Sequence, residues 1–256
     1  MVKTAAFGSR GAKVLNALTI PAPGKTLRPP GLATGVEAES HTLGTKGFLN
    51  YVEQAWREWA LAATADAIHY GHIDCAGLAT YIAVLAGLKG WGIAVPEHKS
   101  DLGSLDAFGD AYDVDLTNSQ GWKLYSVLLQ KGDMFVMRPC VPHFALTLED
   151  CIIYGGHDYC SQTLQETSFG VLQAFAASGI LTNTTHLEAI ESQQRIIAFF
   201  YQEIVECERN YKDLLDEHGS HIIFNLPNFY FIDDVVGFLC LHNLIKLGSI
   251  LDLRRY

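Results

Sequence analysis

Charged residues are scarce in this chain of 256 residues, and basic residues are scarcer than acidic ones. Only 18% of the residues are charged, and 18 Lys and Arg against 28 Asp and Glu give a formal net charge of −10. No cluster of Lys or Arg stands out along the sequence. Because nucleic-acid binding rests on a basic surface, we do not expect DNA or RNA as direct ligands.

Paired cysteine motifs are also missing. The cysteines lack the CxxC spacing of many zinc sites and the density of a disulfide framework. We therefore expect reduced, buried thiols. The six residues concerned are Cys75, Cys140, Cys151, Cys160, Cys207 and Cys240.

The sequence has no long hydrophobic run free of polar residues. The most apolar segment, residues 235–251, contains His242, Asn243 and Lys246, which are costly in lipid. The first ten residues are not followed by the apolar h-region of a secretory signal. We expect a buried helix at 235–251, no membrane contact and an intracellular protein, with nucleus and cytoplasm not distinguished.

The chain contains enough apolar residues to form a folded core. Hydrophobic residues make up 49% of it, which is typical of a globular protein. Residues 1–45 hold four of the eight prolines, which predicts an extended N-terminal arm with little regular structure. We expect a β-rich core over residues 46–165 and a helical C-terminal region over residues 166–256, packed on that core.

Short apolar runs with turn signals between them predict the strands of the core. Residues 72–86 and 89–95 are expected to be two paired strands joined at Gly87, and 122–129 and 134–137 two more. Two further strands, 144–147 and 151–154, are separated by a turn at 149–150, and the second ends at the Gly155-Gly156 pair. Many short strands at close spacing predict a mainly β sandwich or barrel.

The C-terminal third has a different pattern. Residues 187–215 lack Pro and Gly, and their apolar residues recur near helical spacing, which predicts a helix. Residues 231–251 are expected to form a last helix. The aromatic run Phe199-Phe200-Tyr201 fits either the core of a helix or a dimer face. A homodimer through the C-terminal helices is therefore an open alternative.

One short motif points to chemistry. His72 and Asp74 are two residues apart, so on an extended strand their side chains point to the same face and can bind one ion. The best third ligand is His143, which follows a Pro-containing bend at 138–142 that cannot be a central strand. Two His and one carboxylate, with positions left open, form the ligand set of non-haem Fe(II) oxygenases.

Several segments together resemble a known family. The chain is similar to the JmjC branch of the cupin superfamily, in particular to fungal JmjC-domain proteins, over most of residues 14–159. The resemblance implies a double-stranded β-helix, or jelly roll, that carries Fe(II) and 2-oxoglutarate. The segments that carry it are Gly71-His72-Ile73-Asp74, Leu88-Lys89-Gly90-Trp91, Gly132-Asp133, Arg138-Pro139-Cys140-Val141-Pro142-His143 and Tyr154-Gly155-Gly156-His157-Asp158-Tyr159.

The resemblance also implies roles for individual residues. The family's metal ligands, which are its catalytic centre, fall on His72, Asp74 and His143. Its lysine, which pairs with the far carboxylate of 2-oxoglutarate, falls on Lys89. Trp91 fits either a core aromatic or a wall of the cosubstrate site.

The chain departs from the family at two positions near the expected cosubstrate site. Several relatives have a hydroxyl residue where this chain has His69, and often an Asn where it has Ile82. Thr80, which has the strand parity of His72 and Asp74, can supply a hydroxyl instead. For His157 and Tyr159, near the Gly pair, packing is the favoured interpretation over a role on the substrate side.

The functional expectation is a 2-oxoglutarate-dependent dioxygenase that hydroxylates or demethylates an unidentified substrate. A protein side chain and a small metabolite both stay open as substrates. The alternative is a non-catalytic cupin-fold protein, in which a vestigial site binds a structural metal and the helical region offers a partner surface. We thus expect the site to bind a metal ion, we expect that ion to be Fe(II), and we expect 2-oxoglutarate to bind to it. Each of these expectations depends on the one before.

Overall fold

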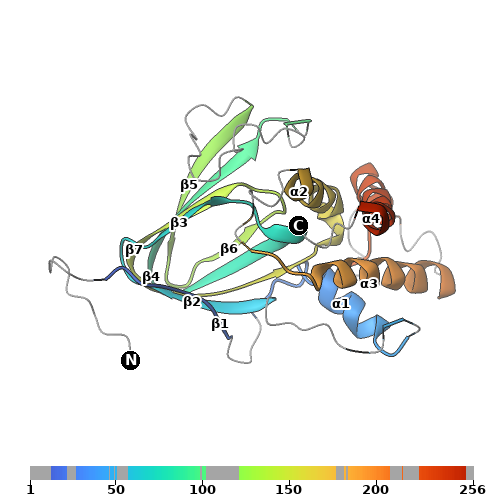
Figure 1. Ribbon diagram of the computed structural model, residues 1–256, viewed down its shortest axis with the longest axis horizontal. Coiled ribbons are helices and arrows are strands. Elements are labelled where there is room, and N and C mark those ends of the chain that lie inside the picture. The colour runs from blue at the N-terminus through green and yellow to red at the C-terminus, as the bar shows by residue number, and fades with distance from the viewer. Residues whose placement is uncertain are drawn as a thin grey trace.

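The fold consists of a curved antiparallel sheet with helices gathered at one end of it (Figure 1). The computed structural model describes residues 13–21, 27–45, 47–48, 50, 57–98, 100–101, 121–176, 182, 184–207, 215 and 225–251. Within these residues the sheet has seven strands: β1 (Asn16–Pro21), β2 (Glu58–Ala63), β3 (Ile68–His72), β4 (Ala79–Pro96), β5 (Trp122–Gln130), β6 (Met134–Met137) and β7 (His143–Asp158).

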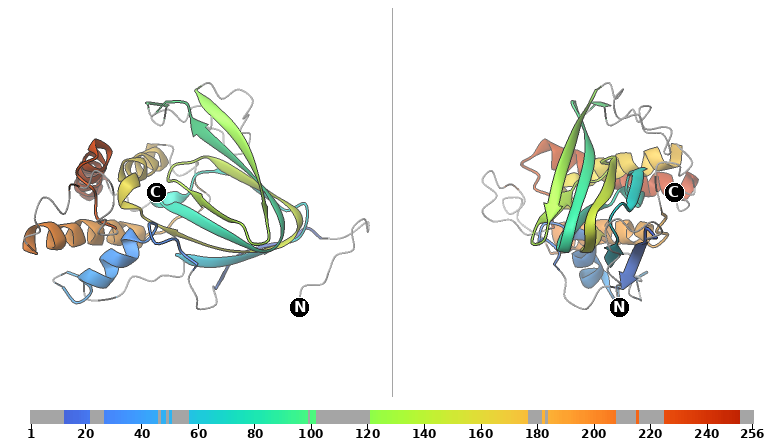
Figure 2. Two further views of the ribbon diagram at one scale, coloured as in Figure 1. Left: turned by 180° about the vertical axis from the view of Figure 1, so that it is seen from behind. Right: turned by 90° about the vertical axis from the view of Figure 1, so that its left-hand side faces the viewer.

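The two long strands β4 and β7 form the middle of the sheet and pair along their length. The pairing register shifts repeatedly between Val84 and Lys89, where the sheet bends (Figure 2). On one side of the bend, β7 pairs with β2 and β4 with β6; on the other, β7 pairs with β3 and β4 with β5. Strand β1 extends the first half through β2. The expectation of a mainly β fold with many antiparallel strands is therefore confirmed.

Two predicted turns are in fact positions inside long strands. Gly87 has φ +84° and sits at the bend of β4, where a Cβ would lie 2.1 Å from the carbonyl oxygen of Asp150. Glycine at this position permits a bulge in β4 and the close approach of β7. Residues 79–96 therefore form one continuous strand and not two strands joined by a turn. Strand β7 likewise runs through 149–150 and through Gly155-Gly156, whose missing side chains leave room for the rings of Trp59 and Tyr81. The strands predicted at 122–129 and 134–137 are confirmed as β5 and β6.

The described part of the N-terminal 45 residues contains a strand and a helix that the prediction of an extended arm missed. Strand β1 pairs with β2, and helix α1 (Thr34–Thr42) packs beside helix α3 (Ala189–Tyr201). The prolines misled the prediction because they cluster outside these two elements or at the end of β1, as Pro21 does. Residues 1–12 and 22–26 lie outside the described part of the chain.

The C-terminal helices are α2 (Leu164–Ala176), α3 and α4 (Ile232–Leu251). Helix α3 continues into a π-helical turn, Gln202–Glu206, and residues 208–214 of the predicted 187–215 helix are outside the described residues. Helix α4 confirms the helix predicted at 231–251, and its Gly237 lets it approach the start of α2. These helices share one apolar core, formed by Leu164, Val171, Ile196, Phe199, Phe200, Leu241 and Leu244.

Helix α4 is long and apolar enough to cross a membrane by length and composition, with a mean hydropathy of 1.4. Only 22% of that window is buried within the protein, so the helix is less buried than the sequence led us to expect. Its Leu241 and Leu244 do lie in the helical core. Length and composition alone are weak evidence for a membrane span, because core helices of soluble proteins share them.

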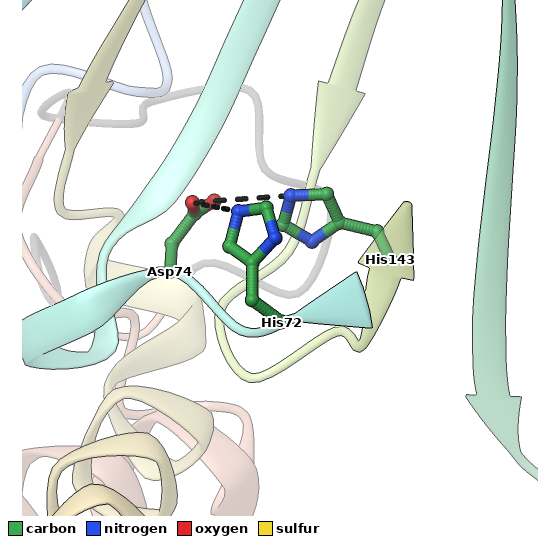
Figure 3. A group of neighbouring side chains, drawn as sticks. All are labelled: His72, Asp74 and His143. Atoms are coloured by element: carbon green, nitrogen blue, oxygen red, sulfur yellow. Dashed lines mark ion pairs between the residues drawn. The ribbon is translucent and has the colours of Figure 1, made fainter. Parts of the chain in front are cut away.

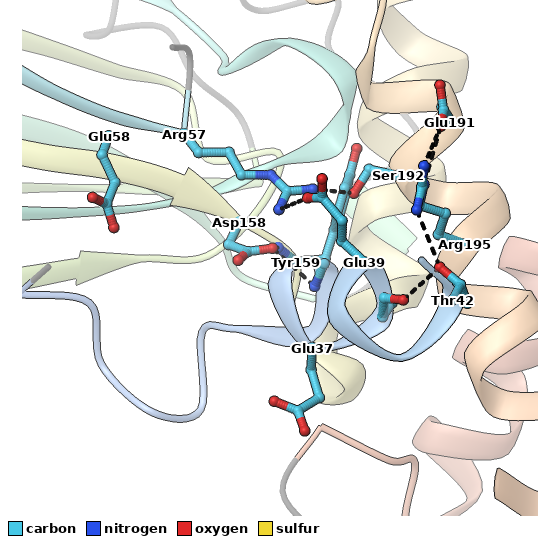
Figure 4. A network of polar contacts seen from close by, with 12 residues as sticks. Glu37, Glu39, Thr42, Arg57, Glu58, Asp158, Tyr159, Glu191, Ser192 and Arg195 are labelled. Carbon is cyan, nitrogen blue, oxygen red and sulfur yellow. Dashed lines mark hydrogen bonds and ion pairs between the residues drawn. The ribbon is translucent and has the colours of Figure 1, made fainter. Parts of the chain in front are cut away.

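A buried polar network joins the sheet to α1 and α3 (Figure 4). The Arg57 guanidinium, fully buried, forms an ion pair of 2.9 Å with Glu39 of α1 and donates a hydrogen bond of 2.9 Å to Ser192 of α3. At the end of β7, Asp158 Oδ1 accepts hydrogen bonds from the backbone N–H groups of Gly35 and Tyr159. Because buried charges must be paired, this network fixes how the helices dock on the end of β7.

Candidate metal centre

Three predicted ligands converge at the mouth of the bent sheet (Figure 3). Asp74 Oδ1 lies 3.9 Å from His72 Nε2 and 4.0 Å from His143 Nε2, and all three ligand atoms lie within 4.8 Å of one another. Ligands at about 2.1 Å from an ion are roughly 3 Å apart when they are neighbours, so an ion would draw these atoms together by about an ångström. The residues thus form a group that could bind a metal ion.

Strand pairing explains why residues so far apart in sequence meet. His72 ends β3 and His143 begins β7, and the two are direct partners across this antiparallel pair. The predicted bend at 138–142 lies between β6 and β7, and within it Cys140 has a left-handed φ of +61°. Asp74 follows β3 in extended conformation, just before the 3-10 turn Cys75–Gly77.

Backbone carbonyl groups set the orientation of both imidazoles. His72 Nδ1 lies 2.7 Å from the carbonyl oxygen of Tyr70, and His143 Nδ1 lies 2.9 Å from that of Val141. A carbonyl oxygen can only accept, so each Nδ1 carries the proton and donates it. In the neutral ring Nε2 then has a lone pair, and both lone pairs are available on the side of Asp74.

A hydrogen bond to Oδ2 fixes the orientation of the Asp74 carboxylate. Thr80, near the start of β4, donates a short hydrogen bond from its hydroxyl to Asp74 Oδ2. Thr80 Oγ1 also lies 2.8 Å from Nδ1 of His157, near the end of β7. Asp74 Oδ1 is therefore the oxygen that faces the two imidazoles.

The pKa values of His143 and Asp74 favour metal binding at neutral pH. Desolvation, then the nearby His72, lowers the pKa of His143 to about 4, although Asp74 opposes this. Desolvation of Asp74 would raise its pKa, but the surrounding imidazoles and the Thr80 hydroxyl together lower it to about 2. Neutral imidazole and ionised carboxylate are the forms that bind metals, so few protons must leave when an ion enters.

A cavity of about 250 Å³ opens over these three residues. Among the described residues that line it, Asp74 is the single carboxylate, and the others carry imidazole, indole, hydroxyl, thiol or aliphatic side chains. Trp91 stacks on His143 with ring centroids 5.6 Å apart and 9° between the planes. The indole Nε1 of Trp91 is buried without a hydrogen-bond partner, as is that of Trp59, which also lines the cavity. Both indoles are therefore donors that a bound ligand could satisfy.

Lys89 lies beside the cavity and is not one of its lining residues. Its side chain is buried in β4, opposite Thr147 of β7, and it forms no hydrogen bond or ion pair with any residue in the described part of the chain. Desolvation lowers the pKa of Lys89, and the nearby Cys151 opposes this. The positive charge of Lys89 also contributes to lowering the pKa of His69. A buried ammonium without a carboxylate is costly, which makes Lys89 a candidate for pairing with a ligand.

Other cavity residues were missed or undervalued by the sequence. His157, for which packing was favoured, lies on the cavity and contacts Thr80. His186 and Thr184 reach the site from the segment before α3, beside the isolated bridge between Thr182 and Ile73. No spacing rule links residues 184–186 to the ligands, and only the fold brings them together. His69 lines the cavity where relatives have a hydroxyl residue, whereas Ile82 is buried in the core of the sheet.

Comparison with known proteins does not identify a family. No family model and no curated protein matches the chain. Among solved structures, it is similar to Peruvianin-I, a cysteine peptidase from Thevetia peruviana latex, with 12% identity and a TM-score of 0.28. That alignment covers 40% of this chain and 48% of the peptidase chain, and a likeness this slight carries no argument about fold or activity.

Proposed function

We propose that the protein is an Fe(II)- and 2-oxoglutarate-dependent dioxygenase of JmjC type. The observation that carries the proposal is the group of His72, Asp74 and His143, in which hydrogen bonds from both Nδ1 atoms turn the Nε2 atoms toward one carboxylate oxygen. Two imidazoles and one carboxylate are a donor set that suits Fe(II) and leaves positions for further ligands.

The bent sheet supports a jelly-roll interpretation. The bend in β4 and β7 divides the strands into two halves, and the metal-ligand group lies where residues of both halves approach each other. A double-stranded β-helix has this arrangement of two facing antiparallel sheets, with a small ligand site between them. We assign this fold as part of the proposal.

The residues around the cavity suit a small dicarboxylate. Lys89 would neutralise the far carboxylate of 2-oxoglutarate, and the Thr147 hydroxyl on the partner strand is buried near the Cys151 thiol. The unpartnered N–H group of Trp91 offers a further donor. Thr80, which we expected to serve the cosubstrate, already gives its proton to Asp74. Its part is to hold the metal ligand.

When bound, Fe(II) with 2-oxoglutarate and dioxygen supplies the oxidation of a substrate C–H bond. One oxygen atom becomes the new hydroxyl group, and the other enters 2-oxoglutarate, which leaves as succinate and carbon dioxide. On an N-methyl group, the hydroxymethyl product would then release formaldehyde, which is demethylation. The protein's part is to orient the reactants and to keep the buried cavity free of bulk water.

The test is turnover of 2-oxoglutarate by purified, Fe(II)-loaded protein. We expect slow succinate formation without substrate, and its loss in the His143→Ala variant. We also expect binding of 2-oxoglutarate to weaken in Lys89→Met, with an unchanged metal content. Protein that binds Fe(II) but neither binds 2-oxoglutarate nor forms succinate would refute the enzyme proposal.

One observation favours a second candidate, a non-catalytic metal-binding or scaffold protein of the same fold. Lys89 does not line the cavity, so a cosubstrate in the cavity as it stands would not contact it. In that case the metal would be structural, and His72→Ala would lower the melting temperature as well as the metal content. An enzyme would instead keep its fold in this variant and lose turnover.

A further inference from the structure

Thr80 and His157 form a chain of hydrogen bonds behind the metal-ligand group that neither the resemblance nor the metal site assigns. Asp74 Oδ2, Thr80 Oγ1 and His157 Nδ1 follow one another at hydrogen-bond distance. They come from the loop after β3, from β4 and from β7. The chain crosses the sheet where β4 and β7 pair, since Thr80 and His157 are direct partners across the two strands.

The direction of each hydrogen bond follows from the groups involved. A carboxylate that binds a cation can only accept, so the single proton of Thr80 goes to Asp74 Oδ2. Thr80 Oγ1 must then accept from His157, and Nδ1 of that ring carries a proton. Burial lowers the pKa of His157, so the ring is neutral and its Nε2 has a lone pair.

The Nε2 atom of His157 faces a different environment from Nδ1. The half-buried ring lines the cavity, with the Trp59 ring 5.6 Å and the His186 ring 6.1 Å away between centroids. No described residue donates a hydrogen bond to this Nε2. Because an unpartnered acceptor at a cavity wall is unfavourable, we expect a ligand in the cavity to donate a hydrogen bond to His157 Nε2.

The backbone of His157 is held firmly enough for such a role. Its N–H donates to the carbonyl oxygen of Arg57 over 2.9 Å, and the next residue, Asp158, is fixed by the N–H groups of Gly35 and Tyr159. Figure 4 shows this end of β7 enclosed by the polar network of α1 and α3. A ligand-binding side chain on a rigid strand end is preorganised.

We propose that His157 has two roles, which rest on the proposed function: through Thr80 it positions Asp74 to bind the metal with one oxygen, and through Nε2 it selects a substrate with a neutral N–H or O–H donor. The donor would stand beside the C–H bond to be oxidised, as in a side-chain amide or an alcohol. A cationic methylammonium group fits less well, because Asp74, the metal ligand, is the only carboxylate among the described residues that line the cavity.

The positioning role is tested by metal binding without cosubstrate. Apo-protein is titrated with Co(II), and its d–d absorption reports the coordination number. In Thr80→Val, Asp74 Oδ2 is released and can also bind the ion, so we expect weaker bands and an affinity lower by about 10- to 100-fold. Thr80→Ser should restore both. Unchanged bands and affinity in Thr80→Val would overturn this role.

The substrate role is tested with variants that separate the two nitrogen atoms. The amide N–H of His157→Asn can replace Nδ1 and keep the bond to Thr80, while the Nε2 acceptor is lost. Acetamide and tetramethylammonium serve as probes, and paramagnetic broadening of their methyl protons by bound Co(II) reports their approach. We expect acetamide to be broadened more than tetramethylammonium in the wild type, and roughly three- to tenfold less in His157→Asn, with unchanged Co(II) bands.

The exposed His98→Asn variant is the control and should match the wild type. Equal broadening of both probes, or acetamide broadening that His157→Asn leaves unchanged, would overturn the substrate role. The Co(II) experiments need no 2-oxoglutarate. A protein that fails to turn over 2-oxoglutarate yet shows these effects would refute the enzyme proposal alone, whereas turnover without them would refute this inference alone.

Discussion

His72 and His143 face each other directly across the pair β3 and β7, and each ring is oriented by a carbonyl oxygen of its own chain segment. The ring centroids are 4.2 Å apart. The Nε2 atoms of the two rings lie 3.9 Å and 4.0 Å from Asp74 Oδ1. Together with Asp74, the pair therefore forms a group that could bind a metal ion.

Replacing either imidazole should remove the metal and keep the fold. In His143→Ala we expect the content of bound Fe(II), measured by atomic emission, to fall from about one ion per chain to background. The far-ultraviolet circular dichroism spectrum should not change, because the sheet hydrogen bonds of β7 are made by the backbone. His98→Ala is the control, since that side chain is exposed at the end of β4. Retention of a full equivalent of iron by His143→Ala would show that the ligands lie elsewhere.

Removing the charge of Lys89 should stabilise the protein and weaken cosubstrate binding. Its ammonium group is buried and lacks a carboxylate partner among the described residues, so Lys89→Met should raise the free energy of unfolding by about 1 to 3 kcal/mol. Lys123→Met is the matched control, because that side chain is 62% exposed and should change stability by less than about 0.5 kcal/mol. Urea denaturation measures both. A destabilised Lys89→Met would mean that the lysine has a structural partner.

The ligand set could be predicted because it depends on local rules. The two-residue spacing of His72 and Asp74 and the proline bend before His143 are properties of short segments. The resemblance added Lys89 and Trp91. Strands β5 and β6 were also predictable, since turn signals bound their short apolar runs, and so was helix α4, which is a long apolar segment that follows Pro227.

The features that could not be predicted depend on contacts between segments that are far apart in the sequence. Gly87 inside a strand has the same local pattern as a hairpin turn, and only the approach of Asp150 explains the bulge. The link from Thr80 to His157 requires the register of β4 and β7. Helix α1 has little amphipathic pattern, and its buried Glu39 depends on Arg57, which comes from a different part of the chain. Such charge burial cannot be read from the helix sequence alone.

Acidification should destabilise the metal-free protein well above the usual range of carboxylate titration. The pKa of His143 is lowered to about 4, mainly by desolvation, from an ordinary value of 6.5. His69 and His186 are lowered to about 4 as well, again mainly by desolvation. A lowered pKa means that the unfolded chain takes up protons first, so stability falls as the pH drops from about 6.5 to about 4.

Urea denaturation of chelator-treated protein at a series of pH values measures this loss. For His143, whose side chain is 4% exposed, the contribution is on the order of 3 kcal/mol across the whole window. In His143→Asn the dependence on pH should be shallower, because one of the three groups is gone. A free energy of unfolding that is flat between pH 7 and pH 5 would contradict the prediction.

The turn that follows Asp74 should be the part of the site most sensitive to a single methyl group. Gly77 has φ +62°, and a Cβ there would lie 2.1 Å from the carbonyl oxygen of Thr167 in α2. The Thr167 hydroxyl in turn donates a hydrogen bond of 2.8 Å to the carbonyl oxygen of Gly77. Moving the turn away from α2 to relieve the clash would therefore break this hydrogen bond. We expect Gly77→Ala to lower the free energy of unfolding by more than about 3 kcal/mol, through the left-handed backbone and the clash together.

Gly132→Ala separates these two causes. Gly132 also has a positive φ, +96°, but nothing lies within 4 Å of a Cβ placed there, so this variant should lose only about 1 kcal/mol. Because Asp74 enters the same turn, Co(II) affinity should fall in Gly77→Ala and stay unchanged in Gly132→Ala. Equal losses of stability in the two variants would mean that the backbone conformation alone matters. The docking of α2 would then have no part in positioning Asp74.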